Sequence, residues 1–185
     1  MSLIKKGYKA LNATRLILLA AWFGAALFFG AVVAPAAFGV LRSFGLSNAN
    51  EIAGSIVTRS LSVVNIAGFI IALILLITLI LRRNYSSRSS FIVECVCLVV
   101  IALATAVGHW FIAARMRALR AAMVVPIDQI AADDSRRIAF NSLHGYSVNA
   151  LSLAMIAALV AMVLMARNQR ADPTLPRYGT DSTQQ

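Results

Sequence analysis

The chain has 185 residues, of which 60% are hydrophobic and 13% charged, and its mean hydropathy is +0.80. A composition this apolar excludes a soluble globular enzyme and a disordered tail. The formal net charge of +10 would also suit a nucleic-acid partner. Lys and Arg, however, stand at the ends of apolar runs rather than along one face, which is the pattern that anchors membrane spans. The expected partner is therefore the lipid bilayer and not nucleic acid.

Four apolar segments are each long enough to cross roughly 30 Å of hydrocarbon at about 1.5 Å per residue. Irregular backbone and open strand edges cannot face lipid, so each segment is expected to be a helix. The first is free of charge between Arg15 and Arg42, and the third is interrupted only by Glu94. The predicted spans are residues 16–41, 58–81, 91–114 and 143–166. The predicted fold class is an all-α, integral membrane bundle of four antiparallel helices.

The segments outside the spans are assigned by charge and by capping residues. Residues 1–15 are expected to be a cytoplasmic N-terminal segment, and residues 167–185 a disordered cytoplasmic tail. The first span is longer than the roughly 7 to 15 apolar residues of a signal peptide, so we expect it to remain in the mature protein. The outer segments 42–57 and 115–142 are expected to be ordered, with helices capped by Ser47 or Asn48 and by Asp134.

Orientation follows from the cations that flank the spans. Ten Lys and Arg residues stand on the side that holds both termini and the short loop after the second span, against seven on the other side. Most of those seven lie in the longer loop, which has less weight in setting orientation. We therefore expect a multi-pass protein of the cell (inner) membrane with both termini in the cytoplasm.

Glu94 is one of three ionisable residues within the spans, where a charge costs about 2.5 to 3.5 kcal/mol on insertion scales. It lies near the cytoplasmic start of the third span, so it is interpreted as an interfacial carboxylate favoured by the helix dipole. The inner loop supplies its expected partners, Arg82, Arg83 and Arg88. The alternative is a proton or cation pathway along the helix face that it shares with Leu98, Ile101 and Thr105.

His109 and His144 are the other two, and antiparallel spans place both in the outer leaflet. Two histidines are too few for a structural zinc site, so no metal is predicted. A haem or copper ion held by this pair, with help from Met116 or solvent, is an alternative. The favoured interpretation is that each ring bonds a backbone carbonyl or a hydroxyl. For His144 we predict a ring packed between helices, with one nitrogen bonded to a neighbouring helix.

The fourth span carries two polar stripes. Ser142, Tyr146 and Asn149 lie on one side, and His144 and Ser147 lie nearly opposite them. Both sides are therefore expected to meet other helices. Asn149 is expected to form an interhelical hydrogen bond, as is Asn65 in the second span.

The first span is expected to pack closely through a small-residue face formed by Ala26, Gly30 and Ala34. Pro35 lacks the N–H that would bond Ala31 and should kink the helix. Trp22 is several residues inside the span and is interpreted as core. Cys95 and Cys97 are about 200° apart around one helix, so they are expected to be buried, reduced and unable to form a chelate or a disulfide.

Three stretches carry a resemblance to a known family. They are Trp22-Phe23-Gly24 with Phe29 and residues 33–38, then Ala53-Gly54-Ser55-Ile56, and finally residues 140–147 followed by Asn149. In their order and spacing over residues 11–166, the chain resembles the transmembrane protein 205-like domains, small four-helix membrane proteins of unknown function. The resemblance implies the four-span topology and falls on Pro35, His144 and Ser147, but not on His109. It implies no catalytic activity and no cofactor.

Three functions compete. The sequence groups no nucleophile with a base and an orienting residue, so the favoured function is a non-enzymatic accessory or homeostatic membrane component without a cofactor. Its partners would be other membrane proteins or further copies of the chain. The second is an oligomeric small-solute or ion permease, suggested by Glu94, Thr105 and the kink at Pro35. The third is a haem- or metal-associated membrane protein that uses His144.

Overall fold

The computed structural model describes residues 2–81, 83 and 88–170, and within this part of the chain every regular element is a helix. In chain order the elements are α1 (Ser2–Phe28), the π-helical η1 (Phe29–Val33), α2 (Ala34–Ser43), α3 (Ala49–Leu81), α4 (Arg88–Ala106), the π-helical η3 (Val107–Ile112), α5 (Ala113–Ala121), the 3-10 helix η4 (Ile127–Gln129) and α6 (Ser135–Arg170). The expected all-α class is confirmed.

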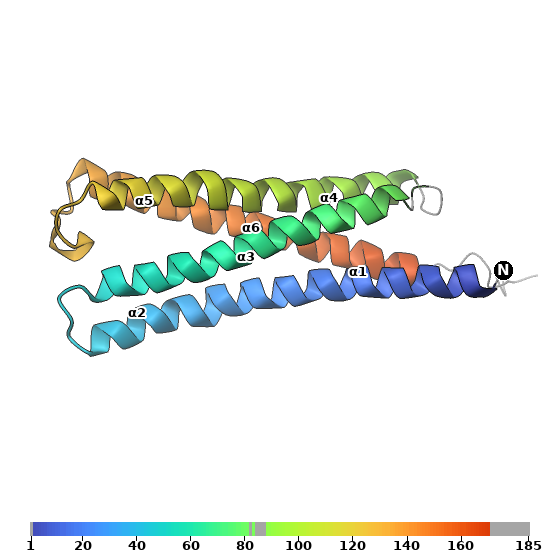
Figure 1. Ribbon diagram of the computed structural model, residues 1–185, viewed down its shortest axis with the longest axis horizontal. Helices are drawn as coiled ribbons and strands as arrows, with labels where there is room; N and C mark the ends of the chain where they lie inside the picture. The colour runs from blue at the N-terminus through green and yellow to red at the C-terminus, as the bar shows by residue number, and fades with distance from the viewer. Residues whose placement is uncertain (1, 82, 84–87, 171–185) are drawn as a thin grey trace, which may run out of the picture.

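These elements form four antiparallel rods (Figure 1): α1 with η1 and α2, then α3, then α4 with η3 and α5, and finally α6. Each rod holds a stretch long and apolar enough to cross a membrane, at Ala10–Ser43, Ala49–Leu81, Arg88–Ala121 and Ser135–Arg167. The protein is thus a multi-pass membrane protein with the four predicted spans. The helices continue past the predicted limits because hydrogen-bonded helix does not stop where hydrocarbon stops.

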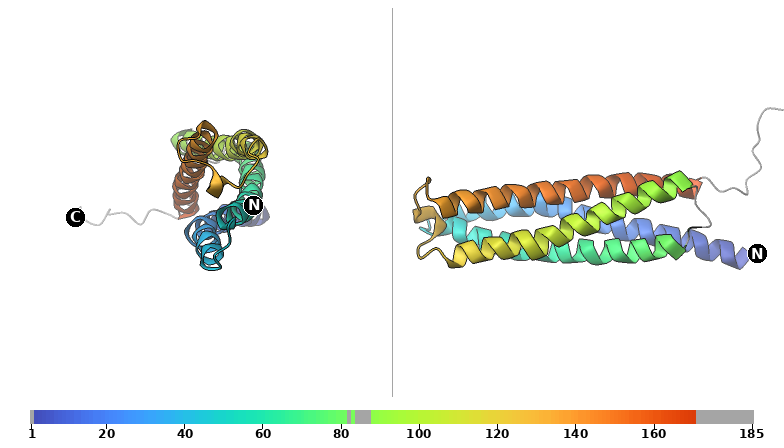
Figure 2. Two further views of the ribbon diagram at one scale, coloured as in Figure 1. Left: turned by 90° about the vertical axis from the view of Figure 1, so that its left-hand side faces the viewer. Right: turned by 90° about the horizontal axis from the view of Figure 1, so that it is seen from above.

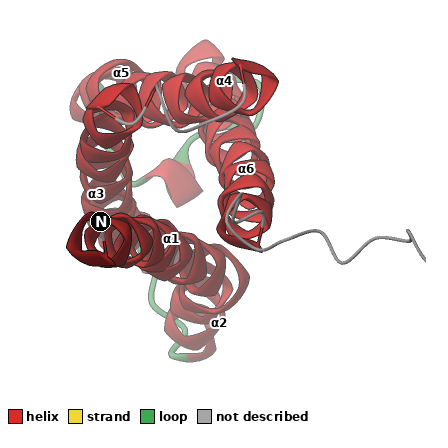
Figure 3. Ribbon diagram, turned by 90° about the vertical axis from the view of Figure 1, so that its right-hand side faces the viewer, coloured by secondary structure: helices red, strands yellow, loops and turns green. Residues whose placement is uncertain are grey.

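Seen along their length, the rods stand at the corners of a square in the order α1, α3, α4, α6 (Figure 3). The α1 and α4 rods therefore face each other across a diagonal. The α2 segment departs from this square and packs against α3. The part of α6 that runs alongside α1 therefore has a neighbouring rod on each side. The part of α6 at the level of α2 lacks one of these two neighbours.

The two ends of the bundle differ. The N-terminal end holds the start of α1, where the helix runs unbroken from Ser2 into the first span. The loop end holds residues 44–48 and a longer cap segment, residues 122–134. Figure 2 shows the cap segment folding across the loop end, with η4 over the centre of the square. The expected disordered tail lies, from residue 171 onward, outside the described residues.

Helix starts at the loop end agree with the expected caps. The Asp134 side chain accepts a bond of 2.8 Å from the backbone N–H of Arg136, which satisfies a donor that α6 would otherwise leave unpaired. The Asn48 carbonyl accepts the N–H of Ile52, so Asn48 holds the N-cap position of α3. Both loop-end segments are therefore ordered by their own cap residues.

Two rods approach each other closely at Trp22 and Gly68. Trp22 is 3% exposed, and its indole N–H donates to the Val64 carbonyl at 2.9 Å. A Cβ at Gly68 would stand 2.6 Å from the indole nitrogen, so only glycine fits beneath this ring. Trp22 is a core residue, as expected.

The expected small-residue face does not form the contact. Ala26 is fully buried, but Gly24 and Gly30 are exposed, and neither has another atom within 4 Å of an added Cβ. The recorded close contact of this rod is instead that of the Trp22 indole with Gly68. Close packing of the first rod therefore depends on a glycine of its neighbour, which its own sequence does not reveal.

Pro35 lies in the first turn of α2, directly after the π-helical η1. The N–H of Ala34 bonds the Phe29 carbonyl, five residues back, instead of the usual four. The expected irregularity at Pro35 thus takes the form of a widened turn in front of the proline.

Candidate binding cavity and buried ion pair

A buried ion pair crosses the diagonal of the bundle. Arg15 Nη2 lies 2.6 Å from Glu94 Oε1, and each side chain is 1% exposed. The same guanidinium nitrogen donates to the Leu75 carbonyl of α3 at 3.1 Å. One contact therefore joins three of the four rods inside the bundle. Neutralisation by a hydrogen-bonded partner is what allows either charge to be buried there.

This pairing corrects two expectations. The partner of Glu94 is Arg15 of the first rod and not Arg83 or Arg88, and Arg15 lies well within its helix rather than at the start of it. The helix begins well before Arg15, so this residue is inside α1, and its long side chain reaches across to the opposite rod. The proposed pathway face is also filled: Leu98 and Ile101 are fully buried, and Thr105 donates to the Ile101 carbonyl of its own helix at 2.7 Å.

The two histidines have different surroundings. His109 is half-buried in η3, and its Nδ1 lies 3.1 Å from the Ser62 hydroxyl of α3. The expectation that His109 bonds a hydroxyl is thus confirmed. His144 is exposed on α6 and makes no hydrogen bond to the described part of the chain, so the prediction of a packed, bonded ring is wrong.

Near the loop end, where α6 begins, the α2 segment lies outside the square formed by the other rods (Figure 3). Asn149 is likewise exposed and forms no interhelical bond with the described residues, while Ser147 is 7% exposed and faces the bundle. The two histidines are not joined by any contact. Among the described residues, no group of three or more His, Cys, Asp or Glu is placed to hold a metal ion.

The expectation that both cysteines are buried holds for Cys97 but not for Cys95. Cys97 is buried, Cys95 is half-buried, and both are free thiols. Asn65 is 4% exposed and packs against Gly108, where a Cβ would stand 3.1 Å from its amide nitrogen. No interhelical hydrogen bond of Asn65 occurs among the described residues.

A cavity of about 680 Å³ lies at the loop end, between α3 and α5 and beneath the cap segment. This volume is in the range typical of small-ligand sites. Its wall is formed by Glu51, Gly54, Ser55, Thr58, Arg59, Ser62, Met116, Arg117, Arg120, Ala121, Met123, Ile127 and Phe140. The wall therefore combines hydroxyls, guanidinium groups and thioethers.

Polar residues of α3 form one side of this cavity. Glu51, Ser55, Thr58 and Ser62 are spaced by four, three and four residues, which places them on one helix face. From Glu51 to Ser62 this face extends about 16 Å along the helix. Its inner end is the contact between Ser62 and His109.

Sequence reasoning missed this face. The second span was judged by its apolar part from Asn65 onward, while the polar spacing lies before it. The spacing of Glu51, Ser55, Thr58 and Ser62 is the signal that would have found one wall of the cavity. Nothing comparable marks the opposite wall on α5.

The charges in the cavity do not balance. Arg120 binds Glu51 Oε1 through Nη2 at 2.5 Å and through Nε at 3.2 Å, so these two charges neutralise each other. Arg59 and Arg117 are exposed, and neither forms an ion pair or hydrogen bond with the described chain. The cavity is therefore left with two uncompensated positive charges.

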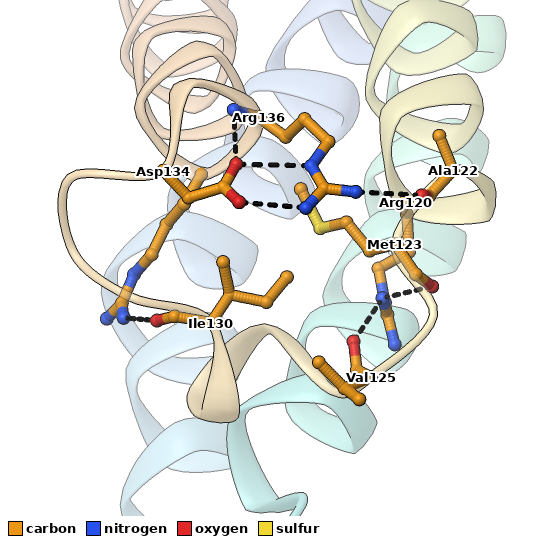
Figure 4. A network of polar contacts seen from close by, with 8 residues as sticks. Arg120, Ala122, Met123, Val125, Ile130, Asp134 and Arg136 are labelled. Carbon is orange, nitrogen blue, oxygen red and sulfur yellow. Dashed lines mark hydrogen bonds and ion pairs between the residues drawn. The ribbon is translucent and has the colours of Figure 1, made fainter.

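Arginines also hold the cap segment in place (Figure 4). Arg120 Nη1 donates to the Val125 carbonyl at 3.0 Å, and Arg136 Nη1 donates to the Ala122 carbonyl at 3.3 Å. Arg137 donates to the Ile130 carbonyl. The Arg136 guanidinium also bonds Asp134 at 2.8 Å and lowers the pKa of that carboxyl to about 2. The roof of the cavity is thus tied to α5 and α6 at both ends.

Comparison with known proteins assigns a family. Residues 17–124 match the family model of a domain of unknown function, DUF4149. The chain belongs to the DUF4149 family. The expected assignment to the transmembrane protein 205-like family is corrected by this match, which falls on DUF4149 instead. No curated protein and no solved structure matches the chain.

The DUF4149 match covers most of the residues that form the cavity. It includes the polar face of α3 and the arginines of α5, together with Glu94, but it ends before α6. His144 and Ser147 lie beyond it. Within this DUF4149 protein, the cavity is therefore built mainly from the part of the chain that defines the family.

Proposed function

We propose that this DUF4149 protein is a non-enzymatic membrane component that binds a small ligand in the cavity at its loop end. The observation that carries the proposal is the cavity itself, because a volume of about 680 Å³ with convergent polar groups and an apolar wall is how ligand sites are built. Two arginines without a counter-charge favour a cavity that binds a ligand over a packing defect.

The contact between Ser62 and His109 raises the possibility of nucleophilic catalysis, since a serine next to an imidazole is the start of a catalytic triad. A third group would have to orient the ring. Among the described residues of the cavity wall the one acidic residue is Glu51, which is bound to Arg120 and lies about 16 Å along α3 from Ser62. We therefore propose that the Ser62 hydroxyl, positioned by His109, belongs to the polar floor of a binding site.

The proposed location is the cell membrane, with the loop end outside and both termini in the cytoplasm. The excess of cations at the N-terminal end supports this orientation. The ligand would then reach the cavity from the outer side or from the outer leaflet. Copies of the chain or other membrane proteins remain the proposed protein partners.

Native mass spectrometry of protein extracted in native lipid nanodiscs tests ligand binding. The variant Thr58→Trp fills the cavity, and Val63→Trp adds the same side chain on the exposed face of α3. We expect the wild type and Val63→Trp to retain a one-to-one small-molecule or lipid adduct that Thr58→Trp has lost. The same adduct pattern in all three proteins would contradict the proposal.

A small-solute permease is the second candidate. It is favoured by the presence of two polar regions along the bundle, the cavity and the Arg15–Glu94 pair, although conduction would require the fully buried Leu98 and Ile101 to move apart. Flux of ions and organic anions into proteoliposomes would support this function if Thr58→Trp, which fills the cavity, stopped it. If liposomes with and without the protein were equally impermeable, the permease function would be contradicted.

A further inference from the structure

Resting on that proposed function, we infer that the cavity binds a phosphate-bearing amphiphile, with the phosphate at Arg59 and Arg117 and the apolar part against the methionines. Phospholipid headgroups and soluble organic phosphates share this chemistry. The inference depends on the charge of the cavity, on where it opens and on what lines its interior.

The charge of the cavity favours an anion. Glu51 is neutralised by Arg120, so the charges of Arg59 and Arg117 remain. A guanidinium presents a rigid fork of donors that matches the oxygens of a phosphate, and it loses little water on binding. A phosphate monoester, with close to two negative charges, would balance the pair.

The cavity opens sideways between α3 and α5. Ser55, Arg59 and Arg117 line it and are also exposed, so its polar edge reaches the surface of the bundle. α3 has 33 residues and is about 50 Å long, whereas the hydrocarbon core is about 30 Å thick. The apolar run of α3 ends toward the loop end near Arg59, so this arginine lies at the level of lipid phosphates.

One wall of the cavity is apolar. Met116 is 9% exposed, Met123 is 5% exposed, and Phe140 closes the far side from α6. Thioether side chains adapt their shape to irregular apolar ligands. An inorganic ion would leave this wall unused, whereas an acyl or similar apolar group attached to the phosphate would cover it.

Binding in micelles of the phosphate-free detergent dodecyl maltoside tests the inference with three probes. Dioctanoyl phosphatidic acid carries both parts, inorganic phosphate carries the anion alone, and dioctanoylglycerol carries the apolar part alone. We expect phosphatidic acid to bind most tightly, with an affinity that falls as salt is raised. Arg59→Gln and Arg117→Gln should each weaken its binding about tenfold, since each removes a charge-assisted contact.

Arg115→Gln is the matched control, because it removes the same charge from the same helix outside the cavity wall. Its affinity should stay within about twofold of the wild type, because Arg115 is about 200° around the helix from Arg117 and its exposed charge is screened by solvent. Arg59 and Arg117 have no described partner, so their variants should unfold at the wild-type temperature. Equal weakening by Arg115→Gln would contradict the assigned site.

The three probes distinguish a lipid from a soluble phosphate, and they distinguish failure of this inference from failure of the proposed function. If inorganic phosphate bound as tightly as phosphatidic acid, the apolar part of the ligand would contribute nothing to binding. The ligand would then be a soluble phosphate. If dioctanoylglycerol bound as tightly as phosphatidic acid, and neither arginine variant changed its binding, the cavity would not recognise phosphate. The proposal that the cavity binds a ligand would still stand. If no probe binds, the inference is wrong, and an adduct lost in Thr58→Trp decides whether the proposed function also falls.

Discussion

Arg15 and Glu94 form a pair whose energetics are asymmetric. Removal of one partner leaves the other charged in a dry interior, which typically costs about 3 to 5 kcal/mol, whereas replacement of both by apolar residues is often neutral or stabilising. Glu94→Gln should therefore destabilise the bundle by about that amount, and Arg15→Met with Glu94→Leu should restore most of it. Reversible unfolding in detergent micelles measures both. A double variant as unstable as the single one would show that the pair itself contributes the stability.

The contact of Gly68 with Trp22 can be tested by the addition of one methyl group. Gly68→Ala places a Cβ 2.6 Å from the indole nitrogen of Trp22, and overpacking of this kind costs about 1 to 3 kcal/mol. Gly24→Ala is the control, because an added Cβ at Gly24 meets open space. The control should be neutral or slightly stabilised by its higher helix propensity. Equal stability of the two variants in micelle unfolding would contradict the close contact.

Asp134 sets a pH dependence at the start of α6. Hydrogen bonds from Arg136 lower its pKa from 3.8 to about 2, so the folded state favours the charged form. The stabilisation is present above about pH 4 and is lost as the pH falls toward 2. Asp134→Asn should lower Tm at pH 6 and match the wild type near pH 2. Asp133→Asn, one residue away and without a described partner, should show no such difference.

The polar face of α3 should be accessible to water over its length. In a background with Cys95 and Cys97 replaced by Ala, single cysteines at Ser55, Thr58 and Ser62 should react with a charged, membrane-impermeant thiol reagent added from outside. Val63→Cys is the control, because Val63 is 66% exposed and faces lipid rather than the cavity. Ser62→Cys and Val63→Cys reacting at the same rate would contradict a water-filled cavity. Reaction only from the inner side would reverse the proposed orientation.

Helices as elements could be predicted well from the sequence. A long apolar run has only one way to satisfy its backbone in lipid, so all four spans were found, and Asp134 marked the start of α6. Helix length was underestimated because polar caps extend the rods beyond the hydrocarbon. The face of α3 that carries Ser55 and Ser62 was missed because hydropathy averages over such a stripe.

Contacts between elements could not be predicted in the same way. The apolar surfaces of the rods are alike, so the sequence does not say which rods are neighbours or where α2 leaves the square. His144 was expected between helices for this reason and is exposed instead. The partner of Glu94 was sought in the adjacent loop, whereas Arg15 is 79 residues away along the chain and on the diagonal rod.

At the scale of the whole molecule, charges and apolar layers alternate along the bundle. The Arg15–Glu94 pair lies toward the N-terminal end, a largely apolar layer that includes the buried Asn65 and Thr105 follows, and the cavity lies at the loop end. The cap segment joins α5 to α6 and covers that end. A ligand bound at the loop end would therefore contact α3, α5 and the cap segment. The apolar layer separates this site from the ion pair.

The diagonal ion pair also has a consequence for biogenesis. A ribosome makes Arg15 79 residues before Glu94, so the first helix enters the bilayer while its arginine has no carboxylate to bind. Until then the guanidinium would have to extend to the headgroups, which would hold α1 nearer the membrane face on the side of the N-terminus than its final depth. Insertion of α4, which carries Glu94, would then let α1 move to its final depth. A cysteine at Thr14 should accordingly react with a membrane-impermeant thiol reagent, added on the side of the N-terminus, in a chain stalled at residue 81, and should react more slowly once α4 has been inserted.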